Sequence, residues 1–427
     1  RSAIFTPLKS PGIIIIDEEH DSSFKQQEGF RYSARDLAVV RAHAEQIPII
    51  LGSATPSLES LHNCTQQRYQ HLTIRSRAGN ARSPEFQLMD IKKLTLNNGL
   101  SSELVTQIQQ HLQQGTQVLV FINRRGFAPS LICHDCGALA ECKRCDARMT
   151  LHQNPAHLHC HHCDSQRPIP RCCDQCGSTA LKPVGAGTER TEQTLNKLFP
   201  DTPVLRVDRD STSRKGSMAK IMEQVHKGAP CILVGTQMLA KGHHFPKVTL
   251  VAILDADSGL FSTDFRGMER TAQMIIQVAG RAGRADHPGK VILQTHHAEH
   301  PLLNLLATKG YDFFAQEELK LRQQYQLPPY QHIAIIRAEA PHTGRAEGFL
   351  HSIRDQQSTT FSQIQWSGPF PSPMEKRAGV FRSQLILSSP SRPLLQHSLS
   401  HLCPGIEDHP MANRIRWTID VDPYDLY

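Results

Sequence analysis

"IIIIDEEHDSSF", residues 13–24, joins an apolar run directly to a cluster of acids. Four consecutive isoleucines without polar alternation indicate a strand buried on both faces, as in the parallel sheets of α/β domains. Asp17, Glu18, Glu19 and His20 follow at the carboxyl end of that strand. Because this edge of a parallel sheet is where α/β domains bind their ligands, the stretch predicts an α/β domain with a polar site.

Other short apolar runs continue this pattern along the chain. Helix-like stretches separate the runs, which lie at residues 47–51, 118–122, 231–235, 250–254 and 291–295. Such alternation predicts open, mostly parallel sheets with helices on both faces. After residue 326 the pattern changes to the polar–apolar alternation of antiparallel strands.

Composition sets broad limits on the protein. A length of 427 residues leaves room for two or three domains. The 47 lysines and arginines exceed the 40 acids, which mildly favours an anionic partner. No apolar stretch reaches the length of a membrane span, and the N-terminus has no signal-peptide pattern.

The cysteines predict zinc. Eight of the twelve form Cys-x-x-Cys pairs, at 133/136, 142/145, 160/163 and 173/176. Two-residue spacing lets both thiolates of a pair bind one tetrahedral Zn²⁺, so four pairs provide two complete structural sites. Sequential and nested pairing both satisfy this number. Neighbouring histidines such as His134 are not expected to be ligands.

Three further motifs suit phosphoryl transfer. "GSATPS" at 52–57 follows the second predicted strand, "GTQMLAKGHHFP" lies at 235–246, and "QVAGRAGRA" at 277–285 carries two arginines three residues apart. Acids at a strand end can hold Mg²⁺ and activate water, and paired arginines suit the charge of a transferring phosphoryl group. Acids after a strand can also simply be solvated.

In this order, the motifs resemble motifs II, III and VI of superfamily-2 helicases. Within that superfamily the four cysteine pairs, "NRRGFAP" at 123–129, "GAGTERTEQ" at 185–193 and the ending "WTIDVDP" resemble the bacterial replication-restart helicases. The resemblance covers essentially the whole chain.

The resemblance implies a domain plan. Its parts are two RecA-like parallel-sheet lobes, the first incomplete, a zinc-binding insertion in the second lobe, and a small α+β C-terminal domain. The expected boundaries are 1–98 for the remainder of lobe 1, 99–132 and 178–326 for lobe 2, 133–177 for the insertion, and 327–427 for the C-terminal domain.

The resemblance also implies roles for single residues. Asp17 matches the Mg²⁺-binding acid and Glu18 the general base, while Glu19 and His20 complete the motif. His20 and the turn at 53–55 would link the state of the nucleotide to that of DNA. The other matches are Arg281 and Arg284 at the γ-phosphate, with Gln277 beside them, Gly242 at the nucleotide and Thr236 at the DNA backbone.

Nested zinc pairing is implied as well. It places Cys133, Cys136, Cys173 and Cys176 in one site, and Cys142, Cys145, Cys160 and Cys163 in the other.

"SSFKQQEGFRYSARD" at 22–36 resembles the aromatic-rich loop that follows motif II in these helicases. Its aromatic rings would stack on unpaired bases while its cations hold phosphates. The alternative is an ordinary helix start with its aromatic rings in the core. The residues concerned are Phe24, Phe30 and Tyr32, with Lys25, Arg31 and Arg35.

A phosphate-cradling G-x-x-x-x-G-K-[ST] motif does not occur, since the one Gly-Lys pair, at 289–290, is followed by valine. In the resembling family this loop lies upstream of the acids. As the chain also starts at Arg1 and not at methionine, we expect the C-terminal part of a larger enzyme, nearly inactive as an ATPase alone.

The function implied is that of an ATP-driven 3′–5′ DNA helicase that uses ATP with Mg²⁺. It would recognise stalled or abandoned replication forks and start primosome assembly. The implied partners are forked DNA, single-stranded-DNA-binding protein and the primosome and restart proteins. We expect a monomer in the bacterial cytoplasm, with no membrane contact.

Two other interpretations compete with this one. The first is a non-enzymatic DNA-binding or primosome-assembly scaffold with a vestigial helicase core. The second is a different superfamily-2 translocase with an acquired zinc ribbon.

Overall fold

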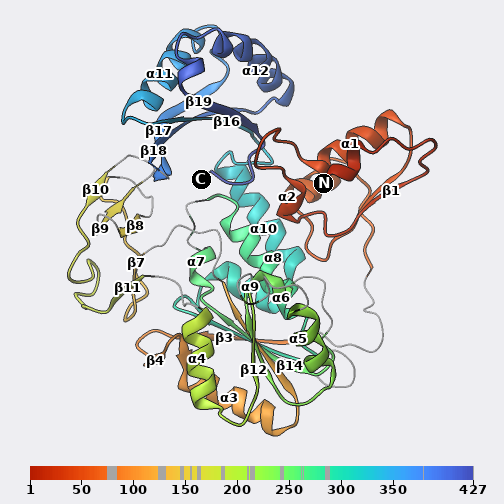
Figure 1. The fold of residues 1–427 in the computed structure, drawn as a ribbon, viewed down its shortest axis with the longest axis vertical. Coiled ribbons are helices and arrows are strands. Elements are labelled where there is room, and N and C mark those ends of the chain that lie inside the picture. Colours follow the sequence, from red (N-terminus) through yellow and green to blue (C-terminus); the bar gives the residue numbers. More distant parts are fainter. Residues whose placement is uncertain are drawn as a thin grey trace. The chain divides into compact units, whose positions relative to one another are not determined.

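The computed structural model describes most of the chain. The described residues are 1–74, 84–123, 131–144, 149–153, 156–160, 165–183, 188–208, 211, 217–240, 245–260, 262, 264–283, 289–377 and 379–426. They form two compact units, one made of residues 1–71 with 318–427 and the other of residues 72–160 with 165–317 (Figure 1).

A six-stranded parallel sheet forms the centre of the second unit. Its order is β12–β13–β6–β14–β15–β3. The bounds are β3 (Glu85–Asp90), β6 (Gln117–Ile122), β12 (Val204–Val207), β13 (Ile232–Gly235), β14 (Val248–Leu254) and β15 (Lys290–Thr295). Every residue of β6 and β14 is buried, which explains their uninterrupted apolar runs.

The sheet corrects one predicted boundary. The prediction placed residues up to 98 in lobe 1, but β3 pairs in register with β15. Residues 85–90 therefore belong to the sheet of lobe 2. The sequence missed β3 because "EFQLMD" has too few apolar residues to stand out as a buried strand.

Helices flank this sheet. They are α3 (Ser102–Gln113), α4 (Thr188–Leu198), α5 (Ser217–His226), α6 (Gln237–Ala240), α7 (Asp257–Leu260), α8 (Gly267–Ala279) and α9 (Pro301–Lys309), while α10 (Tyr311–Gln324) begins in this unit and ends in the first. Ser101 caps α3, since its side chain accepts the N–H of Leu104. Leu104 and Ile108 of α3 are fully buried in the cluster that contains Val118 and Val120. Each such side chain stabilises the fold by about 2 kcal/mol of transfer free energy.

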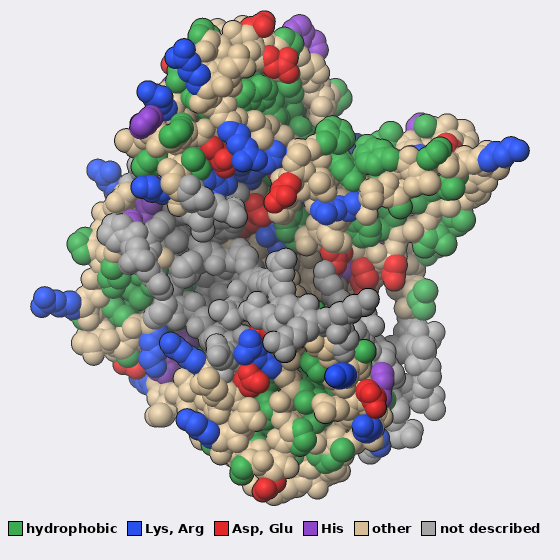
Figure 2. All heavy atoms as spheres, in the orientation of Figure 1, with side chains coloured by type: hydrophobic (Ala, Val, Ile, Leu, Met, Phe, Trp, Pro, Cys, Tyr) green, Lys and Arg blue, Asp and Glu red, His purple; other side chains and the backbone are tan. Residues whose placement is uncertain are grey.

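The N-terminal part of the first unit contains two short parallel strands, β1 (Ile14–Ile16) and β2 (Ile49–Leu51). Helix α1 (Ala34–Ala44) contacts both strands. The expected burial of the isoleucine run on both faces is wrong: Ile16 is buried, but Ile15 is 66% exposed and its partner Ile50 is 51% exposed. Hydrophobic side chains accordingly lie on the surface around α1 and β1 (Figure 2).

The C-terminal part of the first unit is an α+β domain, as predicted. Its antiparallel sheet has the order β17–β18–β16–β19, and two helices share its core. The bounds are β16 (His332–Ala340), α11 (Arg345–Gln357), β17 (Gln365–Arg377), β18 (Val380–Ser389), α12 (Arg392–Glu407) and β19 (Arg416–Val421).

The remaining short elements complete the fold. They are η1 (Ser2–Phe5), η2 (Ser22–Phe24), α2 (Leu58–Thr65), β4 (Leu96–Asn97), β5 (Leu100–Ser101), β7 (Leu131–Cys133), β8 (Thr150–Gln153), β9 (Ala156–His159), β10 (Gln166–Arg167), β11 (Leu181–Pro183) and η3 (Ala412–Arg414). β7 pairs with β11, and β8–β10 form a small antiparallel sheet. Among the described residues, no helix has the length and apolar character needed to span a membrane.

Candidate functional site

The acidic motif lies where β1 ends, beside the turn that follows β2. The N–H of Gly52 donates to the carbonyl of Ile16 over 2.8 Å, and the N–H of Glu19 donates to the carbonyl of Gly52 over 3.0 Å. These two bonds extend the pairing of β1 with β2 and fix the acids against the turn. The resemblance implied a link between His20 and this turn.

Asp17 and Glu18 face solvent at this edge. Glu18 has a φ of 50°, in the left-handed region that residues other than glycine rarely adopt, and its N–H donates to Asp17 Oδ1 over 3.0 Å. Such backbone strain costs on the order of 1–3 kcal/mol and is concentrated at functional sites. The two exposed carboxylates are therefore available to a metal ion and to water.

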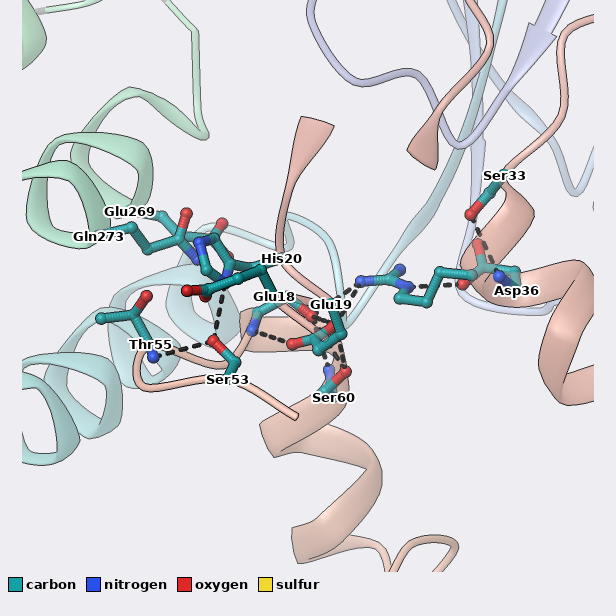
Figure 3. Close-up of polar contacts among 12 residues, drawn as sticks. Glu18, Glu19, His20, Ser33, Asp36, Ser53, Thr55, Ser60, Glu269 and Gln273 are labelled. Carbon is teal, nitrogen blue, oxygen red and sulfur yellow. Dashed lines mark hydrogen bonds and ion pairs between the residues drawn. The ribbon is translucent and has the colours of Figure 1, made fainter. Parts of the chain in front are cut away.

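Glu19 has a different environment from its neighbours. It is 2% exposed, and its carboxylate accepts hydrogen bonds from Ser57 N (2.6 Å), Ser57 Oγ (3.1 Å), Ser60 Oγ (3.0 Å) and Arg35 Nη1 (3.1 Å). Figure 3 shows Glu19 turned toward Ser60 at the start of α2. With its oxygens engaged in this way, Glu19 holds α2 against the acidic motif.

Arg35 does not match the prediction of a phosphate contact. It pairs with Glu19 and with Asp36, whose Oδ1 lies 2.8 Å from Arg35 Nε. Burial alone would lower the pKa of Arg35, but the carboxylates of Asp36, Glu19 and Glu59 raise it overall. The positive charge of Arg35 is therefore balanced by carboxylates within the protein.

His20 connects the acidic motif to the turn after β2. Its Nδ1 lies 2.7 Å from Ser53 Oγ and 3.6 Å from a carboxylate oxygen of Glu18. The same Ser53 hydroxyl accepts the N–H of Thr55 over 2.9 Å (Figure 3). A shift of Glu18 therefore has a direct path through His20 to the turn.

An exposed row of aromatic rings lies in the loop after the acids. Phe30 is 76% exposed, its ring centroid lies 5.7 Å from that of Tyr32, and Tyr32 meets Phe5 edge-on at 5.0 Å. Stacking of Phe30 and Tyr32 on bases stays a prediction, and Phe24, the third predicted ring, is half-buried. Phe5 was not predicted for this row, because it precedes the loop by many residues in the sequence.

The two predicted cations of this loop differ from each other. Lys25 is buried, with its Nζ 2.8 Å from Asp420 Oδ1 and donating to the carbonyl of Val421 over 2.7 Å. It is engaged with the C-terminal domain and does not present its charge to a phosphate. Arg31 is half-buried, and burial, together with Arg337 and Arg416, lowers its pKa. Of the two, Arg31 remains the better candidate for a phosphate contact.

The remaining predicted nucleotide and DNA residues belong to the second unit. Thr236 is buried at the start of α6, while Gln277 and Arg281 lie at the end of α8 and just after it. Gly235, before Thr236, must be glycine, because a Cβ there would overlap the carbonyl oxygen of Val207. Gly242 and Arg284 lie outside the described residues.

Four cysteine sulfurs converge between β7 and β11. Those of Cys133, Cys136, Cys173 and Cys176 all lie within 4.8 Å of one another, which is the set that nested pairing predicts. Cys133 and Cys176 are 3.6 Å apart, and Cys136 and Cys173 are 3.7 Å apart. Tetrahedral ligands at about 2.3 Å from zinc would be about 3.8 Å apart, so the donors fit the ion.

The backbone forms the same turn in both halves of the cysteine site. Gly137 N donates to the carbonyl of Cys133 over 2.8 Å, and Gly177 N to that of Cys173 over 3.0 Å. Both glycines have positive φ, 78° and 73°, so each turn needs glycine after its cysteine pair. We call the residues 133–137 the zinc knuckle.

The thiols are tuned by their surroundings. Although burial raises it, the N–H groups of Cys176 and Gln175 lower the pKa of Cys173 to about 7. For Cys136, burial and the neighbouring thiols raise the pKa to about 12.

The second predicted set is described only in part. Cys142 accepts the N–H of Arg144 over 3.4 Å, as Cys173 accepts that of Gln175. Both Cys142 and Cys160 are buried. Cys145 and Cys163 lie outside the described residues, so this second site stays a prediction.

We expect about two zinc ions per chain and about one after the paired change Cys133→Ser with Cys173→Ser, because each Cys₄ set holds one ion. Zinc content by atomic emission measures this. Cys172→Ser is the matched control, since this exposed neighbour is outside the cluster and should leave the content unchanged. A double variant that keeps both ions, or loses both, would contradict the two ligand sets.

Comparison with known proteins adds three matching family models. Their descriptions are "Primosomal protein N C-terminal domain" over residues 323–424, "PriA DNA helicase Cys-rich region (CRR) domain" over 142–168, and "Helicase conserved C-terminal domain" over 186–286. The cysteine-rich match covers the second predicted zinc set.

Two relatives that match this chain over essentially its whole length share one description. The "Replication restart protein PriA" of Haemophilus influenzae is 51% identical over 427 residues, covering 100% of this chain and 58% of that protein. The protein of the same description from Bacillus subtilis is 36% identical over 432 residues, covering 99% of this chain and 53% of that protein. The chain thus spans just over half the length of these relatives.

Solved structures are less similar. RecG bound to a three-way DNA junction matches 73% of this chain and 30% of its own at 14% identity, with a TM-score of 0.37. Such a score is too low to assign a fold.

Proposed function

Since this chain belongs to the PriA family of replication restart proteins, we propose that the protein is an ATP-dependent 3′–5′ DNA helicase that acts on stalled or abandoned forks. The observation that best supports this is the contact of His20 with Ser53, which joins an acidic motif suited to ATP hydrolysis to a neighbouring turn. Helicases need such a connection, because hydrolysis must be converted into movement on DNA.

Asp17 and Glu18 are the residues of this chain that would act on ATP with Mg²⁺. The metal ion, when bound, would neutralise charge on the phosphates. Asp17 would hold it, and Glu18 would take a proton from the attacking water. Arg281, with Arg284, would face the charge of the γ-phosphoryl group.

The exposed aromatic rings would contact DNA. Phe30, Tyr32 and Phe5 offer successive faces on which unpaired bases can stack, and each stacked base contributes about 1–3 kcal/mol. Arg31 lies in the same loop and suits a backbone phosphate. Forked DNA is accordingly the proposed substrate.

The remaining partners are proposed from the family alone. They are single-stranded-DNA-binding protein and the proteins of the primosome. A monomer in the bacterial cytoplasm suits this role.

Ser53→Ala tests the connection between hydrolysis and movement. We expect fork unwinding to fall by about tenfold, which is what loss of one buried hydrogen bond of about 1.4 kcal/mol produces, while basal ATP hydrolysis stays within about threefold. Both rates are measured on forked DNA with the protein that carries this chain. Ser352→Ala is the matched control, because it removes another serine–histidine bond, the 2.8 Å contact with His409 in the C-terminal domain.

Equal losses of both rates in Ser53→Ala would show that the contact only supports the hydrolysis site. Fork binding without ATP turnover or unwinding in the unmodified protein would favour the scaffold interpretation.

A further inference from the structure

A chain of three buried polar side chains reaches from the six-stranded sheet to the zinc knuckle. His296 Nδ1 lies 2.6 Å from Asp257 Oδ2, and His296 Nε2 lies 2.8 Å from His134 Nδ1. His134 Nε2 then lies 2.6 Å from the carbonyl oxygen of Leu94. Asp257, His296 and His134 are each at most 8% exposed. We call these three residues the relay.

The relay begins at the carboxyl edge of the sheet. Asp257 opens α7, which follows β14, and His296 comes directly after β15. Asp257 also accepts the N–H of His296 over 2.9 Å and the hydroxyl of Thr295. One carboxylate thus fastens the ends of two neighbouring strands, at the edge from which Thr236 also leaves β13.

The relay ends inside the zinc knuckle. His134 stands between Cys133 and Cys136, and its own carbonyl accepts the N–H of Lys93 over 3.1 Å. The knuckle also packs closely on the residues after β15, because a Cβ at Gly137 would lie 3.1 Å from the carbonyl of His296. Side chain and backbone therefore fix the knuckle at the same place.

The relay needs a carboxylate at its inner end. Three hydrogen bonds link Asp257, the two imidazoles and the carbonyl of Leu94, and each bond needs one hydrogen. Two neutral imidazoles carry only two. The third hydrogen belongs to the contact between His296 and Asp257, so the carboxyl group of Asp257 completes the line.

A buried histidine pair can be no more than a satisfied part of a core. The members of the relay, however, come from three segments that are distant in the sequence. All ring nitrogens of the two histidines take part in one continuous row of hydrogen bonds, which joins the edge of the sheet to the zinc knuckle. His111 shows the ordinary case: its Nδ1 contacts Thr249 Oγ1 at 2.7 Å, and that hydroxyl contacts Thr116, whose own hydroxyl donates back to the carbonyl of His111.

We propose that Asp257, His296 and His134 are positioning residues that lock the zinc knuckle to the carboxyl edge of the lobe 2 sheet. Through the relay, a movement of β14 and β15 carries the zinc knuckle with it. The proposal deepens the proposed function, because it makes the zinc insertion a rigid extension of the motor. Its unwinding readout rests on that proposed function.

Amide hydrogen exchange of the full chain with zinc bound tests the locking itself. In Asp257→Asn and in His296→Gln we expect the amides of Cys133 and Gly137 to exchange about tenfold faster, because the knuckle opens locally without its anchor. Zinc content and the exchange of β6 amides should stay unchanged. His111→Gln is the matched control and should leave the knuckle amides at their original rates.

Unchanged knuckle exchange in both variants would overturn the proposal. So would faster exchange that extends equally to β6, since that would mean a general loss of stability, or a parallel loss of zinc, since that would make the relay part of metal binding.

Unwinding gives a second, separable readout. Asp257→Asn should lower fork unwinding by about tenfold while the kcat of DNA-stimulated ATP hydrolysis stays within about twofold, as expected when docking and not chemistry is lost. Equal losses of both would overturn the coupling role. If the unmodified protein does not unwind DNA, the proposed function fails, and the exchange experiment still decides the locking.

Discussion

Replacing Glu18 with glutamine is expected to lower ATP turnover in the protein that carries this chain by about 10²–10⁴-fold, the range for loss of a general base. Glu18 is exposed at the end of β1 and is held in the left-handed region of the backbone, while the adjacent Glu19 is buried and fully engaged. Glutamine keeps the size of the side chain but cannot take a proton from water. Hydrolysis at saturating forked DNA measures the loss, and fork affinity should not change.

Glu45→Gln provides the control for this result. Glu45 pairs on the surface with Arg41 of α1 at 2.8 Å, so losing its charge should alter turnover by less than twofold. If Glu18→Gln retains more than half of the original turnover, another residue is the base. Unchanged restart activity in this variant would mean that the protein acts without hydrolysis.

Asp420→Ala is expected to destabilise the first unit by about 3–5 kcal/mol, because removing one partner of a buried ion pair leaves an uncompensated charge. Asp420 is buried in β19, 2.8 Å from Lys25 Nζ and 3.1 Å from Arg337 Nη1. Its loss leaves two cations facing each other in the interior. Urea unfolding followed by circular dichroism measures the change.

A surface acid of the same domain is the comparison for Asp420. Glu347 is exposed on α11 and lies 3.8 Å from His351, so Glu347→Ala should change the free energy of unfolding by about 0.5 kcal/mol or less. The pair Lys25→Met with Asp420→Ala should recover part of the loss, since it removes the buried ammonium group and Arg337 keeps its 3.9 Å contact with Asp425 Oδ1. A loss below about 1 kcal/mol in Asp420→Ala alone would mean that water reaches the cluster.

Four parallel strands of lobe 2, β6, β13, β14 and β15, were predictable because their burial leaves uninterrupted apolar runs in the sequence, whereas β3 and β12 have no such run. An apolar run of the same kind led to a wrong prediction at residues 13–16, where Ile15 is exposed although its sequence context resembles that of β14. Apolar character predicts a strand. Whether one face or both faces of that strand are buried depends on other segments of the chain, which the apolar run does not identify.

The candidate site was predictable only at the level of motifs. Asp17, Glu18 and Glu19 read as one acidic cluster, and only the tertiary structure separates two exposed carboxylates from one enclosed by serines. Spacing predicted a zinc set because thiolate pairs bind locally. The partner of Lys25 had no such signal, since nothing near residue 25 in the sequence points to Asp420.

The contact of Lys25 with β19 also has a consequence for how the protein is made. At about 5–20 residues per second, a ribosome needs about 20–80 seconds to extend the chain from Lys25 to Asp420. Throughout that time the acidic motif and its aromatic loop lack the strand that neutralises Lys25, with Ile15 and Phe30 exposed on the nascent chain. The segment around Lys25 therefore reaches its final structure only after β19 has been made, and a chaperone that binds nascent apolar segments has that whole interval in which to act there.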